Sequence, residues 1–339
     1  MKNNFMKRLC LILAAIVLIC YGAAAIILKV SNFNILNVIN DTNSFINNNH
    51  VVERHSNTVQ FNDNNSSSSS SNNKGDYNLN DEVNKSLSGI NNINLSFVSS
   101  DLAFHDYDKN EIKVVLTGNL KTSFATTAPK LESSTDGDTV NVSLENKSFL
   151  GIGSYSLNSK IDIYMPKDYS KNLSLGTVSS EINISDKQLN NLKLNSTSGS
   201  IKLSNIKVDS LNAKTVSGDI TGSNVITNKT ETETVSGKVL LDKFEGSSSS
   251  SSVSGDISFN YQSVIGDISA HSTSGDIILK LPKDCSFNLD ASSTSGDMST
   301  KFSLENSSSG KRSLSGTYGN GNNKLSLHTT SGDISVDKN

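Results

Sequence analysis

The sequence predicts an all-β protein whose main part is a parallel β-solenoid, preceded by one N-terminal membrane helix and a linker. Two observations predict the solenoid. A Ser-Gly-Asp-Ile phrase returns at steps of about 20 residues, and apolar and polar residues alternate around each copy as in a half-buried strand. The third observation is an apolar run near the N-terminus that is long enough to cross a membrane.

Each repeat, here called a rung, is centred on the glycine of its phrase, the anchor glycine. We expect these glycines to form corners with positive φ. Because side chains alternate along a strand, the residue two places after each anchor shares one face with its counterparts. We expect this column to form the core. The anchor glycines are Gly199, Gly218, Gly237, Gly255, Gly275, Gly296 and Gly332, and the column is Ile201, Ile220, Val239, Ile257, Ile277, Met298 and Ile334.

A hydroxyl row and two interruptions complete the repeat pattern. A Ser or Thr stands three residues before every anchor, and we expect stacked hydroxyls to bond to one another along the axis. The serine run at residues 247–252 predicts a thinner core in its rung. The doubled spacing before Gly332 predicts a loop insertion or a degenerate rung over 306–323. The final rung is expected to leave an open sheet edge that can pair with another copy.

The N-terminal run, residues 9–28, matches the thickness of a bilayer. Basic residues before it place the N-terminus in the cytoplasm. We therefore expect a cytoplasmic tail at 1–8, a signal anchor at 9–28, and a single-pass protein of the cell membrane whose C-terminal domain is extracellular.

Two other interpretations of this run compete with the anchor. Residues 23–25 are alanines and resemble the cleavage site of a signal peptide. The run continues past them to Leu28, which favours the uncleaved anchor. A lipoprotein signal at Cys20 is disfavoured because Ile19 stands where a small residue is needed.

Between the membrane segment and the rungs, composition changes twice. Residues 29–90 are rich in Asn and Ser and predict a flexible linker, in which His50 and His55 are solvated. Residues 91–168 contain alternating segments without the regular spacing and predict a less regular β cap. Regular rungs are expected over 169–339.

Composition excludes several function classes. The chain has 339 residues, a net charge of −3, 35% hydrophobic residues and no Trp. A near-neutral balance argues against nucleic-acid binding, and the low apolar content is unusual for a compact enzyme. The three cysteines, Cys10, Cys20 and Cys285, provide no disulfide framework. No zincin, nucleophile-elbow or P-loop motif occurs, and His105, His271 and His328 are isolated in sequence, so we expect neither catalysis nor a cofactor.

One column of carboxylates is a candidate metal site. Asp256, Asp276 and Asp297 follow their anchors directly, and stacked rungs would bring neighbouring carboxylates to about 5 Å. Such a ladder either binds a hard cation such as calcium or consists of turn residues facing water. Lys238 and Ser200 interrupt it. The same acids suggest a polysaccharide hydrolase, which the lack of Trp and the scarcity of Arg disfavour.

The sequence also resembles a known family. The pattern Ile161-x-Ile163-x-Met165-Pro166, then Leu173-x-Leu175-x-Thr177, then repeated Ser-Gly-Asp-Ile, resembles the bacterial putative-adhesin family of β-strand-repeat proteins, a domain of unknown function common in Gram-positive envelopes. The resemblance covers residues 91–339. It implies a β-helix-like fold, a surface or membrane-anchored setting and no established catalytic residues.

Together these features predict a non-catalytic extracellular module that binds a surface ligand or an envelope component, or maintains the envelope. An alternative is an envelope-stress accessory or sensor. Its cytoplasmic tail of about eight residues would need a membrane-protein partner. A polysaccharide-active enzyme is the third alternative.

Overall fold

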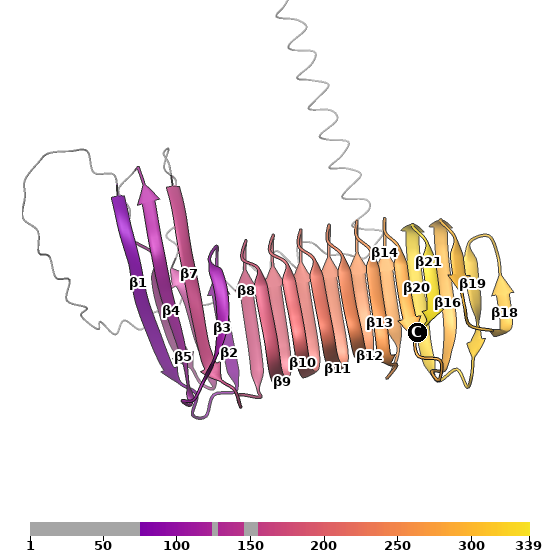
Figure 1. Cartoon of the computed structure of the whole chain (residues 1–339), viewed down its shortest axis with the longest axis horizontal. Helices are drawn as coiled ribbons and strands as arrows, with labels where there is room; N and C mark the ends of the chain where they lie inside the picture. The colour runs from indigo at the N-terminus through magenta and orange to yellow at the C-terminus, as the bar shows by residue number, and fades with distance from the viewer. Residues whose placement is uncertain (1–74, 124–127, 146–154) are drawn as a thin grey trace, which may run out of the picture. The chain divides into compact units, whose positions relative to one another are not determined.

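The computed structural model describes residues 75–123, 128–145 and 155–339, and these residues are all-β (Figure 1). The expected cytoplasmic tail, the membrane segment 9–28 and most of the linker, with His50 and His55, lie outside them. In the part that the structure describes, no helix has the length and apolarity needed to span a bilayer.

The described residues contain 21 strands. Their bounds in chain order are β1 (Gly75–Ser86), β2 (Asn92–Phe97), β3 (Asp101–Tyr107), β4 (Glu111–Thr122), β5 (Lys130–Asp136), β6 (Thr139–Glu145), β7 (Tyr155–Pro166), β8 (Asn172–Thr177), β9 (Ile182–Ser196), β10 (Ile201–Thr215), β11 (Ile220–Thr234), β12 (Val239–Ser252), β13 (Ile257–Ser263), β14 (Ile268–Ser272), β15 (Ile277–Leu281), β16 (Phe287–Ser295), β17 (Met298–Thr300), β18 (Glu305–Ser309), β19 (Ser313–Tyr318), β20 (Asn323–Ser331) and β21 (Ile334–Lys338). The described chain divides into two compact units, of which the first holds residues 75–213 and 225–227 and the second holds 214–224 and 228–339.

The first unit begins with a four-stranded sheet in the order β1-β4-β7-β3. β1 and β4 pair antiparallel over their whole length. The linker predicted over 29–90 therefore extends too far, because residues 75–86 form a strand. Leu79 and Leu87 are buried, and their burial stabilises a segment whose Asn-rich composition resembles that of a linker.

Parallel pairing in the first unit starts with β2 and β8. Ile93 lies opposite Leu173 and Leu95 lies opposite Leu175, and all four side chains are buried. β6 pairs with the other edge of β2, and β8 pairs in parallel with the second half of β9. The segment predicted as an irregular cap thus joins parallel strands to the antiparallel pairs β4/β7 and β5/β6.

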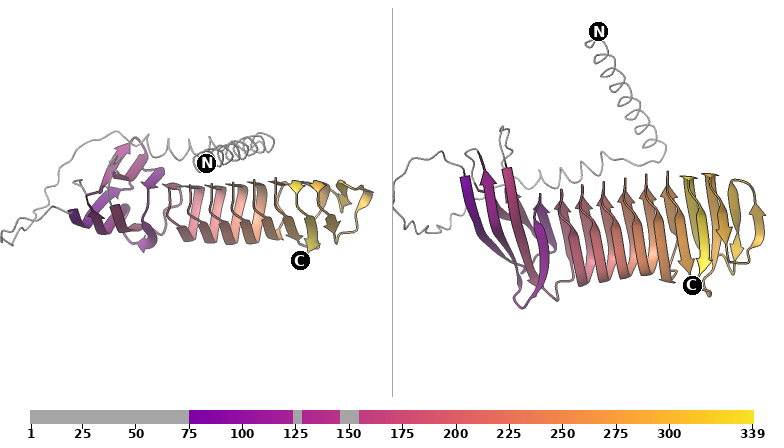
Figure 2. Two further views of the ribbon diagram at one scale, coloured as in Figure 1. Left: turned by 90° about the horizontal axis from the view of Figure 1, so that it is seen from above. Right: turned by 45° about the horizontal axis from the view of Figure 1, so that its top comes forward.

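The second unit is a ladder of parallel strands in which the chain end is inserted. β12 pairs with β13 and β14, and β13 pairs with β15. β20 then lies between β14 and β16, and β21 lies between β15 and β17 (Figure 1). Figure 2 shows the yellow strands of the chain end between orange strands. The expected open edge at the final rung is therefore wrong, because both of its edges are paired.

The segment between the last two phrases is also different from the expected loop or degenerate rung. Residues 305–309 and 313–318 form β18 and β19, which pair antiparallel, and β19 pairs antiparallel with β16. These strands occupy the edge of β16 that β20 leaves free. Antiparallel strands thereby end the parallel ladder on this side.

The anchor glycines are needed for close packing between rungs, not for positive φ. Gly199, Gly218, Gly237, Gly255, Gly275 and Gly296 do not have positive φ, although Gly332 does. A Cβ added to Gly237 would lie 1.8 Å from the carbonyl oxygen of Gly218 in the adjacent rung. The left-handed corners fall six residues after Gly199, Gly218 and Gly237 instead, at Asn205, Asn224 and Lys243. A fourth, Asp186, lies six residues after Ser180, which stands where an anchor glycine would be.

The hydroxyl row bonds to the backbone and not to itself, which corrects the expected chain of hydroxyls. Thr234 Oγ1 accepts a hydrogen bond from the N–H of Gly237 at 3.0 Å and donates to the carbonyl of Gly218 at 3.3 Å. Ser252 Oγ likewise accepts from the N–H of Gly255 at 2.9 Å, and Ser272 Oγ donates to the carbonyl of Gly255 at 3.2 Å. Each hydroxyl thus satisfies backbone groups at the turn, where strand pairing stops.

The serine run is accommodated by a polar and aromatic core. Ser248, Ser250 and Ser252 are buried. Thr232 and Ser250 share a hydrogen bond of 2.7 Å between their hydroxyls, and Ser248 bonds to the hydroxyl of Tyr261 at 2.6 Å. The fully buried ring of Tyr261 packs against Phe244. The expected thin core is therefore filled by a large side chain from the next rung.

Candidate ligand-binding surface

The predicted core column lies inside the fold. Its seven members are buried except Met298, which is half-buried. Within each unit, strand pairing holds the outward side chains of successive rungs about 4.8 Å apart. Two outward features of the second unit are candidates for function: the aspartate column and a lysine-lined groove.

The aspartates that follow the anchor glycines are stacked along the ladder in an order that differs from their order in the sequence. Asp333 lies between Asp276 and Asp297, because the chain end is inserted. The N–H of Asp276 donates to the carboxylate of Asp256 at 3.1 Å, that of Asp333 donates to Asp276 at 2.8 Å, and that of Asp297 donates to Asp333 at 2.8 Å. Each of these carboxylates therefore links its rung to the next.

This bonding uses carboxylate oxygens that a cation would need. Lys238 continues the column, and its N–H donates to Asp219 at 2.8 Å while its ammonium lies 3.7 Å from Asp256. Among the described residues, no group of three or more His, Cys, Asp or Glu side chains is placed to hold a metal. The column acts chemically as a series of charge-assisted hydrogen bonds.

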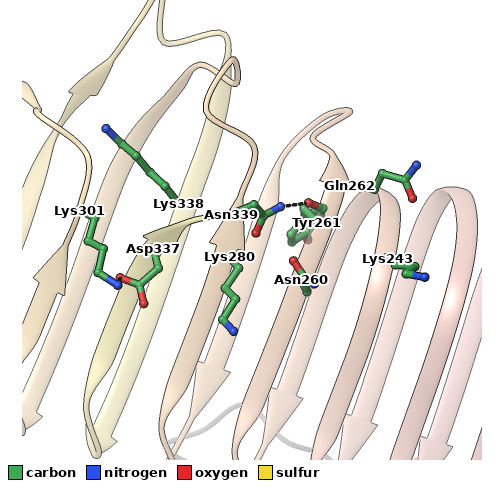
Figure 3. A pocket seen from close by; sticks show the side chains of 9 residues that line it. All are labelled: Lys243, Asn260, Tyr261, Gln262, Lys280, Lys301, Asp337, Lys338 and Asn339. Carbon is green, nitrogen blue, oxygen red and sulfur yellow. Dashed lines mark hydrogen bonds and ion pairs between the residues drawn. The ribbon is translucent and has the colours of Figure 1, made fainter.

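An open groove of about 820 Å³ lies where the strands of neighbouring rungs end in the second unit (Figure 3). We call it the lysine groove. Four of its nine lining residues are lysines, one is acidic and three carry side-chain amides. The lining residues are Lys243, Asn260, Tyr261, Gln262, Lys280, Lys301, Asp337, Lys338 and Asn339.

Strand register aligns these side chains in a row. Asn260 lies opposite Lys280 in the β13/β15 pair, and Lys280 lies opposite Asp337 in the β15/β21 pair. Lys243 sits at the left-handed corner of β12, where the register with β13 shifts by one residue. Lys301 directly follows β17, which pairs with β21. The row thus crosses five rungs, and only the inserted chain end brings Asp337 and Lys338 into it.

The four ammonium groups have different surroundings. Lys301 pairs with Asp337 at 3.3 Å. The ammonium of Lys338 lies over the rings of Phe302 and Tyr318, at 5.1 and 5.6 Å from their centroids, and Figure 3 shows its side chain directed away from Lys280. Within the described residues, Lys243 and Lys280 form no ion pair, and both are exposed. These two lysines are the available cations of the groove.

Hydrogen bonds of the chain end fix the floor of the groove. The side-chain amide of Asn339 donates to the carbonyl of Tyr261 at 2.6 Å, and its N–H donates to the carbonyl of Leu281 at 2.9 Å. Complete burial raises the pKa of Tyr261 well above its ordinary value, so its hydroxyl stays neutral. Outside the groove, burial raises the pKa of the half-buried Cys285 to about 11, which keeps this thiol protonated at neutral pH.

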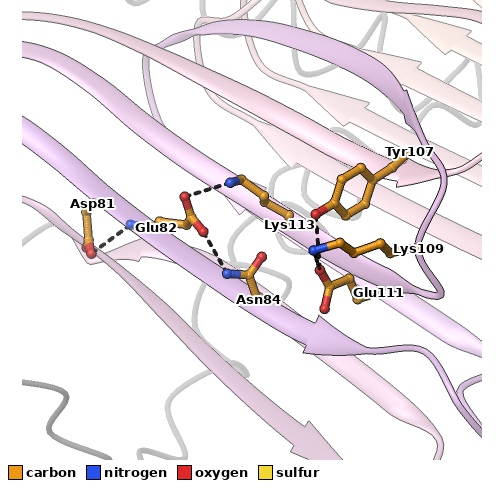
Figure 4. A network of polar contacts seen from close by, with 7 residues as sticks. All are labelled: Asp81, Glu82, Asn84, Tyr107, Lys109, Glu111 and Lys113. Atoms are coloured by element: carbon orange, nitrogen blue, oxygen red, sulfur yellow. Dashed lines mark hydrogen bonds and ion pairs between the residues drawn. The ribbon is translucent and has the colours of Figure 1, made fainter.

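A second polar cluster lies on the first unit, where β1 and β4 pair (Figure 4). Glu82 accepts bonds from Lys113 at 2.8 Å and from Asn84 at 2.7 Å. The bond with Lys113 is the main cause of the lowered pKa of Glu82. Tyr107 donates to Glu111 at 3.1 Å. Lys109 lies 3.7 Å from the carboxylate of Glu111. Each of the two lysines is thus paired with a carboxylate, and the cluster stabilises strand pairing.

The three histidines that look isolated in the sequence each have a polar neighbour in the structure. His105 bonds through Nε2 to the carboxylate of Asp162 at 2.6 Å. His271 and His328 lie opposite each other in β14 and β20. Burial, followed by the nearby His328, lowers the pKa of His271. The side chain of Ser292 bonds to Nδ1 of His328 at 2.7 Å. Both histidines stand four residues before their anchors, a signal that becomes useful only when the order of rungs is known.

Comparison with known proteins gives the family. The model of the Toastrack DUF4097 family matches residues 90–337. No curated protein matches the chain. Structural similarity extends to a putative adhesin from Parabacteroides distasonis (9% identity, 79% of this chain and 98% of that chain, TM-score 0.42), a putative adhesin from Bacteroides fragilis (12%, 79% and 99%, 0.39) and a putative lipid binding protein from P. distasonis (15%, 77% and 97%, 0.36).

Proposed function

Because the chain belongs to the Toastrack DUF4097 family, we propose that it is a non-catalytic binding or structural module of the cell envelope. The module is held outside the cell membrane by residues 9–28. Its rigid strand ladders present rows of polar side chains to an external ligand or to another envelope component. The resemblance to adhesin-like repeat proteins noted in the sequence is consistent with this role.

The observation that carries the proposal is that outward polar side chains form hydrogen bonds from one rung to the next. In the first unit, the amide of Asn191 donates to Asn172 at 2.7 Å, and that of Asn172 donates to Asn92 at 2.8 Å. In the second unit, the aspartates bond to the next rung in the same way. Polar groups that bond along a row form a preorganised flat surface, which suits many weak contacts with an extended partner.

Protease accessibility tests the anchoring. Intact cells that produce the full chain with a C-terminal epitope are treated with a protease that does not enter the cell. We expect the epitope to be lost from protease-treated intact cells, and the full chain to stay in the membrane fraction of untreated cells. An epitope protected until the cells are lysed would contradict the extracellular placement.

Crosslinking in intact cells tests the role of the surface. A binding module captures external or wall-associated material, and photo-crosslinkers at outward positions such as Lys280 and Lys311 report it. Capture of one neighbouring membrane protein in place of external material would favour the sensor alternative. Release of new reducing ends from cell-wall glycans by the purified full chain would overturn the non-catalytic proposal.

A further inference from the structure

We infer that the lysine groove of the second unit binds a linear phosphodiester polymer, the chemistry of a polyol-phosphate chain. This inference deepens the proposed function and rests on the module being exposed to envelope polymers. It starts from the two available cations, Lys243 and Lys280, which lie in one groove and form no ion pair within the described residues.

The shape of the groove favours a polymer over a small anion. The groove is open and its lining residues follow one another across five rungs, so a ligand is held along a line and not enclosed. Lys243 and Lys280 belong to rungs separated by the rung of Asn260. Their backbones are therefore about 10 Å apart, or two strand spacings. Single charges at this separation suit a chain that carries one negative charge per repeat unit.

The cations of the groove suit phosphate. All of its charged donors are lysines, which bind phosphate oxygens as point charges. The amides of Asn260, Gln262 and Asn339 lie among the lysines. They provide neutral polar contacts for hydroxyl groups between the phosphates.

The two remaining lysines of the groove already contact other side chains of the protein. Lys301 is neutralised by Asp337 at 3.3 Å, and Lys338 lies over Phe302. The inserted β21 supplies both Asp337 and Lys338, so it adds one anion and one cation to the groove. Lys243 and Lys280 therefore remain the cations that a ligand reaches without breaking an ion pair or a ring contact among the described residues.

The experiment measures binding of poly(glycerol phosphate) to the full chain in neutral detergent by titration calorimetry at several salt concentrations. We expect binding that weakens with salt. The double variant Lys243→Gln/Lys280→Gln is expected to bind about ten-fold more weakly or worse, and its salt slope should fall by roughly 0.7 for each lysine lost. Both residues are exposed, so these substitutions leave the core unchanged.

Lys311→Gln is the matched control, because Lys311 is exposed on the second unit and does not line the groove. This variant should bind like the wild type. Equal loss in Lys311→Gln, or no loss in the double variant, would overturn the inference. So would equal binding of inorganic phosphate on a molar basis, tighter binding of a polyuronate, or lysine-dependent binding of phosphatidylglycerol vesicles without polymer binding.

The result is separable from the broader proposal. If the full chain is exposed on cells and captures external material, but poly(glycerol phosphate) does not bind, only the assignment of the groove fails. If the chain is not exposed on cells, the proposed function fails, whatever the groove binds in solution.

Discussion

The backbone N–H of Asp333 donates a hydrogen bond of 2.8 Å to the carboxylate of Asp276, although the two residues are 57 positions apart. The bond exists because the last two strands of the chain pair between earlier strands. β20 lies between β14 and β16, and β21 lies between β15 and β17. Several properties of the second unit depend on this insertion.

Hydrogen exchange should detect the inserted rung directly. The N–H of Ile334 donates to the backbone carbonyl of Asp297 and that of Ile277 donates to the backbone carbonyl of Asp333, both at 2.9 Å. Both isoleucine side chains are buried. We expect the amides of Ile334 and Ile277 to exchange at similar slow rates, since both belong to one cooperative ladder. Amides of the exposed strand β18 are the internal reference. An Ile334 amide that exchanges as fast as those of β18 would show that the final rung is a loose edge.

Gly237→Ala should strongly destabilise the second unit. The added Cβ would lie 1.8 Å from the carbonyl oxygen of Gly218, so the rungs must separate to admit it. We expect the free energy of unfolding to fall by about 3 kcal/mol or more, measured by urea denaturation. Ser236→Ala, an exposed neighbour in the same turn, is the control and should change stability little. Near-equal stability of the two variants would refute the steric role of the anchor glycine.

The bond between Ser248 and Tyr261 should show strong coupling. Tyr261→Phe leaves the buried hydroxyl of Ser248 without its partner, and Ser248→Ala does the same to Tyr261. Each change is expected to cost about 1–3 kcal/mol of unfolding free energy. The double variant should cost less than the sum, since no unsatisfied hydroxyl remains. Additive effects in chemical denaturation would mean that the bond contributes little.

Acid should destabilise the first unit partly through Asp106. Its side chain bonds to the buried ammonium of Lys187 at 2.7 Å, and this bond is the main cause of its lowered pKa. A carboxylate with a lowered folded-state pKa stabilises the fold above its unfolded value of about 3.9, and this stability is lost as the pH falls through the folded value. The thermal midpoint of Asp106→Asn should therefore fall less than that of the wild type between about pH 5 and pH 2.

The exposed Asp108→Asn is the matched substitution for this series and should follow the wild-type profile. Removal of Asp106 also leaves Lys187 buried without its partner, so Asp106→Asn should be less stable than Asp108→Asn at pH 7. An Asp106→Asn profile parallel to the wild type would show that the pair does not respond to acid.

Calcium should leave the thermal midpoint unchanged. The carboxylates of Asp256, Asp276 and Asp333 already accept backbone N–H groups at 2.8 to 3.1 Å, and calcium prefers six to eight oxygen ligands. Scanning calorimetry of the full chain with and without millimolar calcium measures the effect. A rise in the midpoint that disappears in Asp276→Asn would establish the cation ladder in place of the hydrogen-bond ladder.

Much of the repeat could be predicted from local pattern. The alternation around each anchor places Ile220 and Ile257 on the inner face, because side chains of a strand alternate whatever its partners are. The anchor glycine was found for the wrong reason, since its φ is ordinary and its constraint is the carbonyl of the neighbouring rung. A contact between rungs is not visible in a single repeat.

The sequence alone determined the all-β class, the spacing of the rungs and the inner apolar column, because these depend on residues close together in the chain. Only the tertiary structure decided that the final rung lies between β14 and β16, since a rung of this shape stacks equally well on any other. This position of the final rung fixes the order in which the aspartates stack and places His271 opposite His328. It also places Asp337 beside Lys301 in the lysine groove. The rungs present similar surfaces to one another, so the alternation within each rung does not reveal the order in which the rungs stack.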